Sequence, residues 1–303
     1  SMIACDADQD GATDLLLFTP GEPMIMVRGD AADAAKKGKP QQVLTDKEMA
    51  SFGLVQAAAP ENTALFDADG DGKDELLIAD KNFVRACRYD AKSGWKVISQ
   101  VTVSDPGTSL VGLTVLDAGS NAGGGGKRIV ASDKGNGRLL FLTPSEVQER
   151  LRLPGFTPST IYAGAFGGDQ QPGVLCLSDD AFALVRLAGT RLKMEQFAAY
   201  RSDSRDRSEY DVEFGDLNAD GFVDAAVVDS GEQMCSILTF SASRKVQLAT
   251  EFEMYESRLF SGGEGRELEP RDMMVIDCTG DGKDDLLLLI HDRVIVHPQA
   301  GKK

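Results

Sequence analysis

A short acidic loop that leads directly into an apolar segment recurs four times in this chain. In chain order, loops 1 to 4 and their flanks read ACDADQDGATDLLLFT, LFDADGDGKDELLIAD, FGDLNADGFVDAAVVD and VIDCTGDGKDDLLLLI. Numbered from the first aspartate, each loop has oxygen-bearing side chains at positions 1, 3, 5 and 9 and a glycine at position 6. Such self-similarity indicates a repeat architecture, in which each copy marks one structural unit.

Two weaker copies lie in the long interval between loops 2 and 3. The segment TVLDAGSNAGGGGKRIVASD keeps Asp117 and the apolar segment after it, whereas AGAFGGDQQPGVLCLSDD keeps only Asp169 and its apolar segment. With Asp117 and Gly167 as anchors, the repeats begin near 6, 67, 117, 167, 216 and 277, in steps of 61, 50, 50, 49 and 61 residues. We therefore expect a single domain over residues 1–303, built from six units.

Each unit predicts short β-strands joined by turns. One apolar stretch such as TALF precedes the loop, ELLIA follows it, and stretches such as FVRACRY and WKVISQVTV complete the unit. Four short strands per unit are typical of a propeller blade, so the predicted fold class is an all-β propeller of about six four-stranded blades. Because the chain ends 26 residues after Asp277, we expect the last blade to lack its outer strand. The alternative is a fragment of a seven- or eight-bladed propeller. The helix candidates are short: TDKEMASF near 45–52 and SEVQERLR near 145–152.

The acidic loops offer hard oxygen ligands at one fixed spacing. The candidate metal ligands are Asp6, Asp8, Asp10 and Asp14 in loop 1; Asp67, Asp69, Asp71 and Glu75 in loop 2; Asp216, Asn218, Asp220 and Asp224 in loop 3; and Asp277, Thr279, Asp281 and Asp285 in loop 4. Such ligands suit Ca²⁺, and no thiolate or imidazole that would favour zinc stands at these positions. Two carboxylates about 4 Å apart repel by roughly 4 kcal/mol at an effective dielectric near 20, so a loop that gathers several needs a cation. We expect about four calcium ions per chain.

Two simpler interpretations of the loops are less satisfactory. Asp and Gly are common in solvated turns for local reasons, but four copies at the same spacing, each before a strand, go beyond that. An EF-hand requires a glutamate at position 12 and flanking helices. Position 12 is apolar in every loop: Leu17, Ile78, Val227 and Leu288.

The segments DADGDGKDELLIAD and DLNADGFVDAAVVD resemble the FG-GAP or VCBS-type repeats of integrin-α-like β-propellers. The resemblance covers nearly the whole chain, strongly in four repeats and in degenerate form in the two central ones. It implies Ca²⁺ in the hairpin between the first and second strands of a blade, bound by the side chains at positions 1, 3, 5 and 9. Thr279 replaces the usual Asp or Asn, so we expect a weaker fourth site. We expect no metal in the repeats near 117 and 167.

The charge of the chain bears on its partners and location. With 48 acidic and 32 basic residues the net charge is −16, which disfavours nucleic acid and anionic membranes as partners. No apolar run approaches the roughly 20 residues needed to span a bilayer, so we expect no direct membrane insertion. Extracellular calcium modules often bind at about 10⁻⁴–10⁻³ M, a level found outside cells and not in resting cytosol. We therefore expect an exported protein, at the extracellular side, the cell surface or the periplasm, and a chain that is part of a longer one.

Binding is a better expectation than catalysis for this sequence. The two histidines, His291 and His297, lie around the last strand, and no nucleophile elbow, zinc-protease motif or phosphate loop is present. We expect a non-catalytic protein-interaction or ligand-binding module whose protein or glycan ligand is unknown. The candidate ligand-binding residues lie in basic and aromatic links between blades: Tyr200, Arg201, Arg205, Arg207, Tyr255 and Arg258.

Two alternatives stay open. A carbohydrate-binding, lectin-like propeller would want exposed aromatics in each blade, and the chain has one tryptophan and five tyrosines. A propeller polysaccharide lyase would need a cluster of Tyr, Arg, His or Lys side chains that converge on one face.

Overall fold

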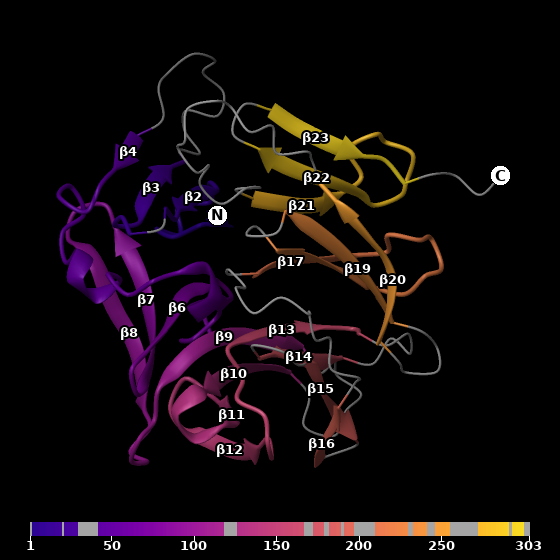
Figure 1. Ribbon diagram of the computed structural model, residues 1–303. Coiled ribbons are helices and arrows are strands. Elements are labelled where there is room, and N and C mark those ends of the chain that lie inside the picture. The colour runs from indigo at the N-terminus through magenta and orange to yellow at the C-terminus, as the bar shows by residue number, and fades with distance from the viewer. Residues whose placement is uncertain are drawn as a thin grey trace, which may run out of the picture. The chain divides into compact units, whose positions relative to one another are not determined.

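The computed structural model describes most of the chain. The described residues are 2–19, 21–29, 42–117, 126–166, 172–178, 182–188, 191–196, 210–229, 233–240, 246–254, 272–290 and 293–299. They form six antiparallel sheets, each made of strands that are consecutive in the chain (Figure 1). This is the six-bladed β-propeller class that the repeat predicts, and the sixth sheet has three strands within the described part of the chain.

The first three blades hold twelve strands and three 3₁₀ turns. Blade 1 consists of β1 (Met2–Cys5), β2 (Asp14–Leu17), β3 (Ile25–Arg28) and β4 (Gln42–Leu44). Blade 2 consists of β5 (Thr63–Phe66), β6 (Glu75–Asp80), β7 (Phe83–Asp90) and β8 (Gly94–Thr102), preceded by η1 (Phe52–Leu54) and η2 (Pro60–Asn62). Blade 3 consists of β9 (Leu110–Asp117), β10 (Lys127–Asp133), β11 (Arg138–Leu142) and β12 (Val147–Arg152), with η3 (Lys134–Asn136) before β11.

The last three blades follow the same order. Blade 4 consists of β13 (Thr160–Gly164), β14 (Gly173–Leu177), β15 (Phe182–Ala188) and β16 (Arg191–Gln196). Blade 5 consists of β17 (Tyr210–Gly215), β18 (Asp224–Asp229), β19 (Met234–Phe240) and β20 (Val246–Glu253). Blade 6 consists of β21 (Asp272–Ile276), β22 (Asp285–Ile290) and β23 (Arg293–His297).

Both short helix candidates are wrong. Residues 147–152 form β12, in which half-buried and exposed residues alternate, and Leu151 pairs with Leu139 of β11. The burial of VQERLR alternates at a period of two residues, and an outer strand of a blade tolerates the charged residues that make the segment resemble a helix. Residues 45–51 form turns that lead into η1, and Met49 is buried there and accepts a hydrogen bond from the Trp95 indole at 3.4 Å.

The chain divides into two compact units. Unit 1 comprises 1–164, 172–179 and 183–195, and unit 2 comprises 165–171, 180–182 and 196–303. Each is described by itself below. No helix among the described residues has the length and apolar character needed to cross a membrane.

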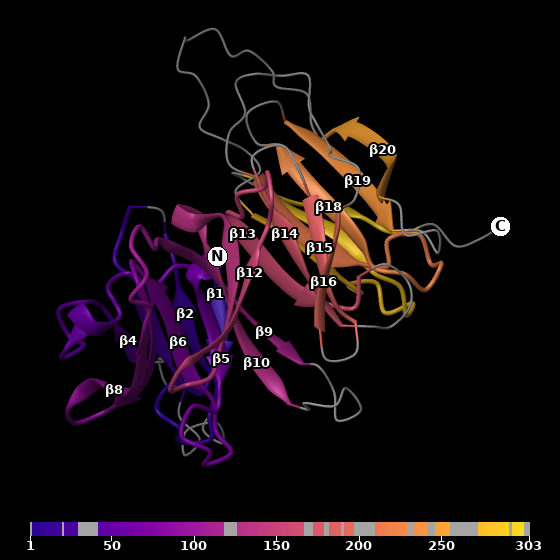
Figure 2. The same cartoon turned by 90° about the horizontal axis from the view of Figure 1, so that it is seen from below.

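In unit 1, stacked blades bury the inner strands on both faces. Side chains of β6 alternate between two cores: Leu76 and Ile78 pack with blade 1, while Leu77 and Ala79 pack with blade 3. Figure 2 shows the sheets of blades 1 and 2 side by side. The double burial explains the continuous apolar run ELLIA after loop 2, since each fully buried Leu or Ile contributes about 1.5–3 kcal/mol.

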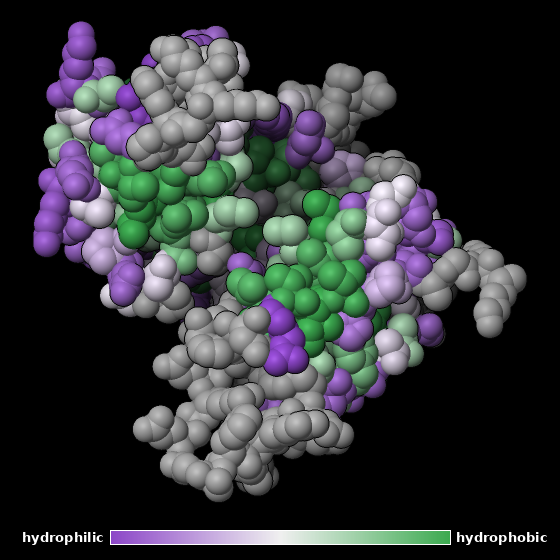
Figure 3. All heavy atoms as spheres, turned by 90° about the horizontal axis from the view of Figure 1, so that it is seen from above, coloured by the Kyte–Doolittle hydropathy of each residue, from purple (hydrophilic) through white to green (hydrophobic). Residues whose placement is uncertain are grey.

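In unit 2, blades 5 and 6 share a core that includes Met273, Leu286 and Leu288. The other face of blade 6 is apolar and exposed, as the green surface on the right of Figure 3 shows. Its most exposed apolar residues are Val294 at 57% and Ile276 and Leu289 at 46% each. An exposed apolar face of this kind is suited to contact with another apolar surface.

Candidate metal centres

The four acidic loops connect the first and second strands of blades 1, 2, 5 and 6, which is the location that the sequence predicts. Loop 1 joins β1 to β2, loop 2 joins β5 to β6, loop 3 joins β17 to β18, and loop 4 joins β21 to β22. Position 9 is the first residue of the second strand in every case. The acids of one loop therefore surround one tight turn at the end of a hairpin.

The glycine at position 6 adopts a left-handed conformation in all four loops. The φ values are +90° for Gly11, +88° for Gly72, +85° for Gly221 and +81° for Gly282. Each of these N–H groups donates to a carboxylate oxygen of position 1, at 2.9 Å for Asp6, 2.9 Å for Asp67, 2.8 Å for Asp216 and 2.8 Å for Asp277. Glycine is fixed here because a side chain would strain this backbone, and position 1 is acidic because it caps the turn.

The aspartate at position 5 makes a second recurring turn. Its carboxylate accepts the N–H of position 7, at 2.8 Å in loops 1 and 2, 2.9 Å in loop 3 and 3.1 Å in loop 4. Part of the acidic pattern therefore has a local structural reason, because such contacts stabilise a turn without any ion. Each carboxylate oxygen has a further lone pair that these contacts leave for another ligand.

The acid at position 9 is buried in all four loops. Asp14, Glu75, Asp224 and Asp285 are at most 1% exposed. Asp14 accepts the N–H of Ala7 at 2.9 Å and that of Gly29 at 2.8 Å, so it ties the loop to the end of the third strand.

Asp285 plays the same part in loop 4, where it accepts the N–H groups of Cys278 at 3.1 Å and Gln299 at 2.9 Å. The bond from Gln299 is the main cause that lowers the pKa of Asp285 to about 2, against the effect of desolvation. The loop-to-strand tie is a role that the sequence analysis did not foresee. Direct contact of position 9 with an ion stays a prediction.

Asp224 of loop 3 is a buried carboxylate with one oxygen that lacks a hydrogen-bond partner among the described residues. It is fully buried, and its Oδ2 atom has no hydrogen-bond partner within the described part of the chain. Its other oxygen lies 3.4 Å from the amide nitrogen of Asn218, and the backbone N–H groups of Leu217 and Phe240 also bond to this carboxylate. Burial first, and then Asp220 and Asp216, raise the pKa of Asp224 to about 7. A cation at this point would relieve both the desolvation and the repulsion.

In loops 1 and 2 the first three acids converge. One carboxylate oxygen from each of Asp6, Asp8 and Asp10 lies within 4.8 Å of the others, and the same holds for Asp67, Asp69 and Asp71. Oxygens on one Ca²⁺ lie 2.3–2.6 Å from the ion, hence at most about 5 Å apart. The spacing and the oxygen chemistry both fit calcium. The Oδ1 atom of Asp6 is also buried and lacks a partner among the described residues.

The loops are joined in neighbouring pairs. In unit 1, the Gln9 amide donates to Glu75 at 2.8 Å, and Lys73 Nζ donates to the Gln9 carbonyl at 2.8 Å. In unit 2, Asp284 accepts the N–H of Asp216 at 2.8 Å, and Gln299 Nε2 donates to the Asp216 carbonyl at 2.8 Å. Loops 1 and 2 therefore form one pair, and loops 3 and 4 another.

Two arginines that the sequence analysis missed enter the first pair of loops. Arg28 binds Asp8 and Asp10, and Arg88 binds Asp69, Asp71 and Glu75. Burial works against the charge of Arg88, but its bonds to Glu75 and Asp69 prevail and raise its pKa. A sequence signal exists, since each arginine follows the position 9 acid by 14 or 13 residues. It becomes meaningful only with the strand register.

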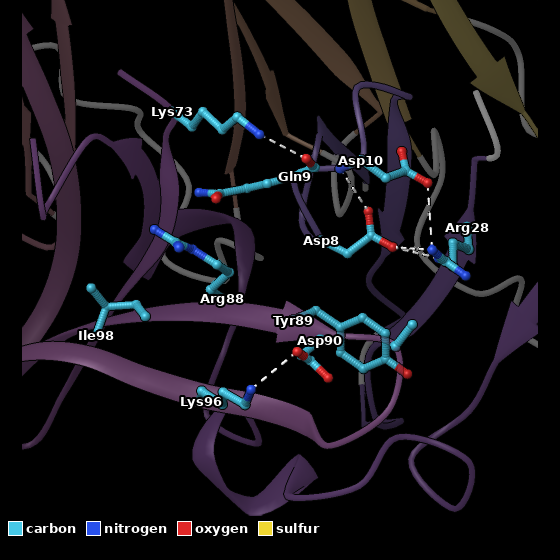
Figure 4. Close-up of a pocket in the computed structure, with 11 residues that line it drawn as sticks. Asp8, Gln9, Asp10, Arg28, Lys73, Arg88, Tyr89, Asp90, Lys96 and Ile98 are labelled. Carbon is cyan, nitrogen blue, oxygen red and sulfur yellow. Dashed lines mark hydrogen bonds and ion pairs between the residues drawn. The ribbon is translucent and has the colours of Figure 1, made fainter. Parts of the chain in front are cut away.

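A pocket of about 420 Å³ lies beside these arginines (Figure 4). Its lining comes from loops 1 and 2 and strands β3, β7 and β8. The four cationic side chains are all engaged: the two arginines with acids, Lys73 with the Gln9 carbonyl, and Lys96 with Asp90 at 3.0 Å. The charges that line this pocket therefore balance one another locally.

The other residues singled out from the sequence are placed as follows. The candidate ligand-binding residues Tyr200, Arg201, Arg205, Arg207, Tyr255 and Arg258 lie outside the described residues, as do Asp169 and His291. Asp117 is the last residue of β9. The ring of His297 lies 5.3 Å from that of Phe252, and burial lowers the pKa of His297. All five cysteines are free thiols.

Comparisons with known proteins bear on the fold. No protein-family model matches the chain, and no curated protein matches it. The solved structure of BBS1N in complex with ARL6DN, soaked with lead, is similar with a TM-score of 0.57 and 13% identity, over 97% of this chain and 76% of that chain. A protein from Lactobacillus plantarum is similar with a TM-score of 0.53 and 12% identity, over 95% of this chain and 77% of that chain. At these identities the likeness shows the fold alone.

Proposed function

We propose that this protein is a non-catalytic, calcium-binding β-propeller that serves as an interaction module of a larger exported protein. The observation that carries the calcium part is the buried carboxylate of Asp224, whose Oδ2 atom lacks a partner within the described residues while Asp216 and Asp220 repel it. An unpaired buried charge is costly, so a loop that keeps one is suited to a cation.

The repeated geometry extends this argument to the other loops. All four share the left-handed glycine at position 6 and the same caps from positions 1 and 5. Positions 1, 3 and 5 would supply side-chain oxygens to the ion, and the buried carboxylate at position 9 would supply further negative charge close to it. The ion would neutralise carboxylates that otherwise repel. These features agree with the proposed kinship to FG-GAP or VCBS-type repeats, and they favour a compartment with millimolar calcium.

The interaction part of the proposal draws on the fold. The structure of BBS1N, which shares the fold, is that of a complex with ARL6DN. We propose a protein ligand for this chain also. Against a catalytic role, the described histidine, His297, packs against Phe252, and burial lowers its pKa. That setting suits a core side chain better than one that transfers protons.

The test is a thermal melt in millimolar Ca²⁺, Mg²⁺ or EDTA, together with a count of bound metal by native mass spectrometry. Each filled site stabilises the fold by about 1.4 kcal/mol at a tenfold excess of calcium over Kd. We expect calcium to raise the melting temperature well above the value in EDTA, and magnesium to have a smaller effect. Equal melting temperatures in all three buffers, with no bound calcium, would refute the proposal.

A further inference from the structure

Arg28 and Arg88 occupy equivalent places in their blades. Leu15 of β2 pairs with Val27 of β3, so the neighbouring Asp14 lies opposite Arg28. Leu76 of β6 pairs with Cys87 of β7, so Glu75 lies opposite Arg88 in the same way. In both blades the third strand therefore places a guanidinium across from the buried acid at position 9.

Each arginine contacts the oxygens that the loop offers to an ion. Arg28 Nε donates to Asp8 Oδ2 at 2.5 Å, and its Nη2 atom lies 3.4 Å from Asp10 Oδ2. Asp8 and Asp10 are positions 3 and 5 of loop 1. A guanidinium in this place neutralises part of the charge that calcium would neutralise.

Loop 2 repeats the arrangement with more contacts. Arg88 Nη2 lies 2.7 Å from Asp69 Oδ2 and 3.3 Å from Asp71 Oδ2, and Nε donates to Glu75 at 3.1 Å. The Arg28 and Arg88 side chains are 24% and 25% exposed, so solvent screens these pairs less than it screens a pair on an open surface.

Loops 3 and 4 have other residues at the equivalent place. Ala225 pairs with Leu238, which puts Thr239 opposite Asp224, and Leu286 pairs with His297, which puts Pro298 opposite Asp285. The following residue supports this alignment. The backbone N–H of Gly29, Phe240 or Gln299 bonds to the position 9 acid in loops 1, 3 and 4 respectively.

In the described part of the chain, basic side chains neutralise the carboxylates of loops 3 and 4 less than the arginines neutralise those of loops 1 and 2. Lys283 of loop 4 reaches Asp281 at 3.2 Å, but that carboxylate is 44% exposed and the lysine belongs to the loop itself. No lysine or arginine among the described residues contacts the carboxylates of loop 3. Exposed pairs of this kind contribute little.

We infer that Arg28 and Arg88 are resident counter-cations that lower the calcium affinity of loops 1 and 2 and hold these loops folded without metal. This inference rests on the proposed function, because it assigns the residues that set affinity at the proposed sites. Calcium must displace a guanidinium from loops 1 and 2, whereas at loop 3 it meets a carboxylate with no such partner in the described residues. The pair of loops in unit 1 therefore stays folded without calcium, whereas the pair in unit 2 depends on calcium.

The test uses loss and gain of the arginine. Arg28→Gln and Arg88→Gln keep a side chain that donates hydrogen bonds but remove the charge. Thr239→Arg places a guanidinium opposite Asp224. Lys96→Gln is the control, since it removes one positive charge from the same pocket without touching an acidic loop. Calcium titration calorimetry gives the affinities, native mass spectrometry gives the stoichiometry, and a melt in EDTA gives the metal-free stability.

We expect each glutamine variant to tighten one calcium site about tenfold and to melt at a lower temperature than the wild type in EDTA. Thr239→Arg should weaken one site about tenfold, and Lys96→Gln should resemble the wild type. If the wild type binds calcium but the arginine variants bind it with unchanged affinity, the inference fails and the proposed function stands. If neither the wild type nor any variant binds calcium, both fail. A glutamine variant that does not fold leaves Thr239→Arg, in the other unit, as the deciding measurement.

Discussion

The carboxylate of Asp284 accepts a 2.8 Å hydrogen bond from the backbone N–H of Asp216, 68 residues earlier in the chain. Position 8 of loop 4 thus holds position 1 of loop 3. The approach is close: a Cβ on Gly215 would lie 2.7 Å from Asp284 Oδ2 and 2.3 Å from Val275 Cγ1. The two candidate metal centres of unit 2 are therefore in direct contact through this hydrogen bond.

Replacing Asp284 with alanine should weaken loop 3 although Asp284 is not one of its predicted ligands. The N–H of Asp216 would lose its acceptor, at a cost of about 1 kcal/mol in the free energy of unfolding. We expect calcium to bind loop 3 several-fold more weakly, measured by titration calorimetry. Asp74→Ala is the matched control, because Asp74 is position 8 of loop 2 and is exposed. Equal effects of the two substitutions would contradict the proposed link.

Replacing Asp224 with asparagine should have opposite effects with and without calcium. In EDTA at pH 8, the substitution removes a buried charge close to Asp216 and Asp220, so we expect a gain of about 1–2 kcal/mol in the free energy of unfolding. In millimolar calcium the wild type should be the more stable of the two, because the ion needs the charge that the variant lacks. Chemical denaturation in the two buffers measures both values. A variant that is less stable than the wild type in EDTA would show that the carboxylate is compensated by other means.

Left-handed backbone in loop 3 gives a paired prediction on stability. Gly221 at position 6 has φ +85°, whereas Ala219 at position 4 has φ +55°. An L-residue in the left-handed region costs roughly 1–2 kcal/mol. We expect Gly221→Ala to lower the free energy of unfolding by about that amount and Ala219→Gly to raise it or leave it unchanged. Thermal melts in EDTA decide the matter, and the reverse order of the two variants would count against the loop conformation.

The sequence was most informative where an interaction is local. The glycine at position 6 and the caps from positions 1 and 5 lie within one loop, so their spacing alone predicts the turn. Burial on both faces makes strands such as β6 continuous apolar runs, which are equally plain in the sequence. The outer strand β12 alternates between half-buried and exposed residues, but its sequence also suits a helix, because half-exposed strands and short helices can both be rich in polar residues.

Contacts between residues on different strands of a hairpin could not be predicted from the sequence alone. Arg28 and Asp14 belong to different strands, and only the register of β2 with β3 reveals that they are opposite one another. The same holds for the buried role of position 9, whose partner Gly29 lies 15 residues away. The predicted metal ligands and the predicted ligand-binding links stay predictions, the latter because they lie outside the described residues.

A charge network in blade 3 predicts a pH dependence that has no connection with calcium. Asp105 accepts hydrogen bonds from Arg150 at 2.9 Å and Arg138 at 2.7 Å, which together hold the pKa of Asp105 below its usual value. A carboxylate with a depressed pKa contributes stability above its unfolded pKa of about 3.9 and loses it as the pH falls through the folded pKa. Asp105→Asn should therefore be less stable than the wild type at pH 7. The difference should begin to shrink below about pH 4 and disappear once the pH is below the folded pKa of Asp105. Glu61→Gln, an exposed acid outside the network, is the control. A difference that does not shrink as the pH falls below about 4 would assign the effect to packing.

The single tryptophan provides a direct view of how the two units differ. Trp95 is 1% exposed in the core of unit 1, where its ring lies 5.4 Å from that of Tyr89. Its fluorescence reports the unfolding of unit 1, while far-ultraviolet circular dichroism reports strands in both units. If arginines neutralise loops 1 and 2 and unit 2 depends on calcium, then in EDTA the dichroism should begin to change at a lower temperature than the fluorescence. Calcium should bring the two transitions together, mainly by moving the dichroism upward. Coincident transitions in EDTA would mean that the units unfold as one cooperative body, and that the arginines give unit 1 no separate protection.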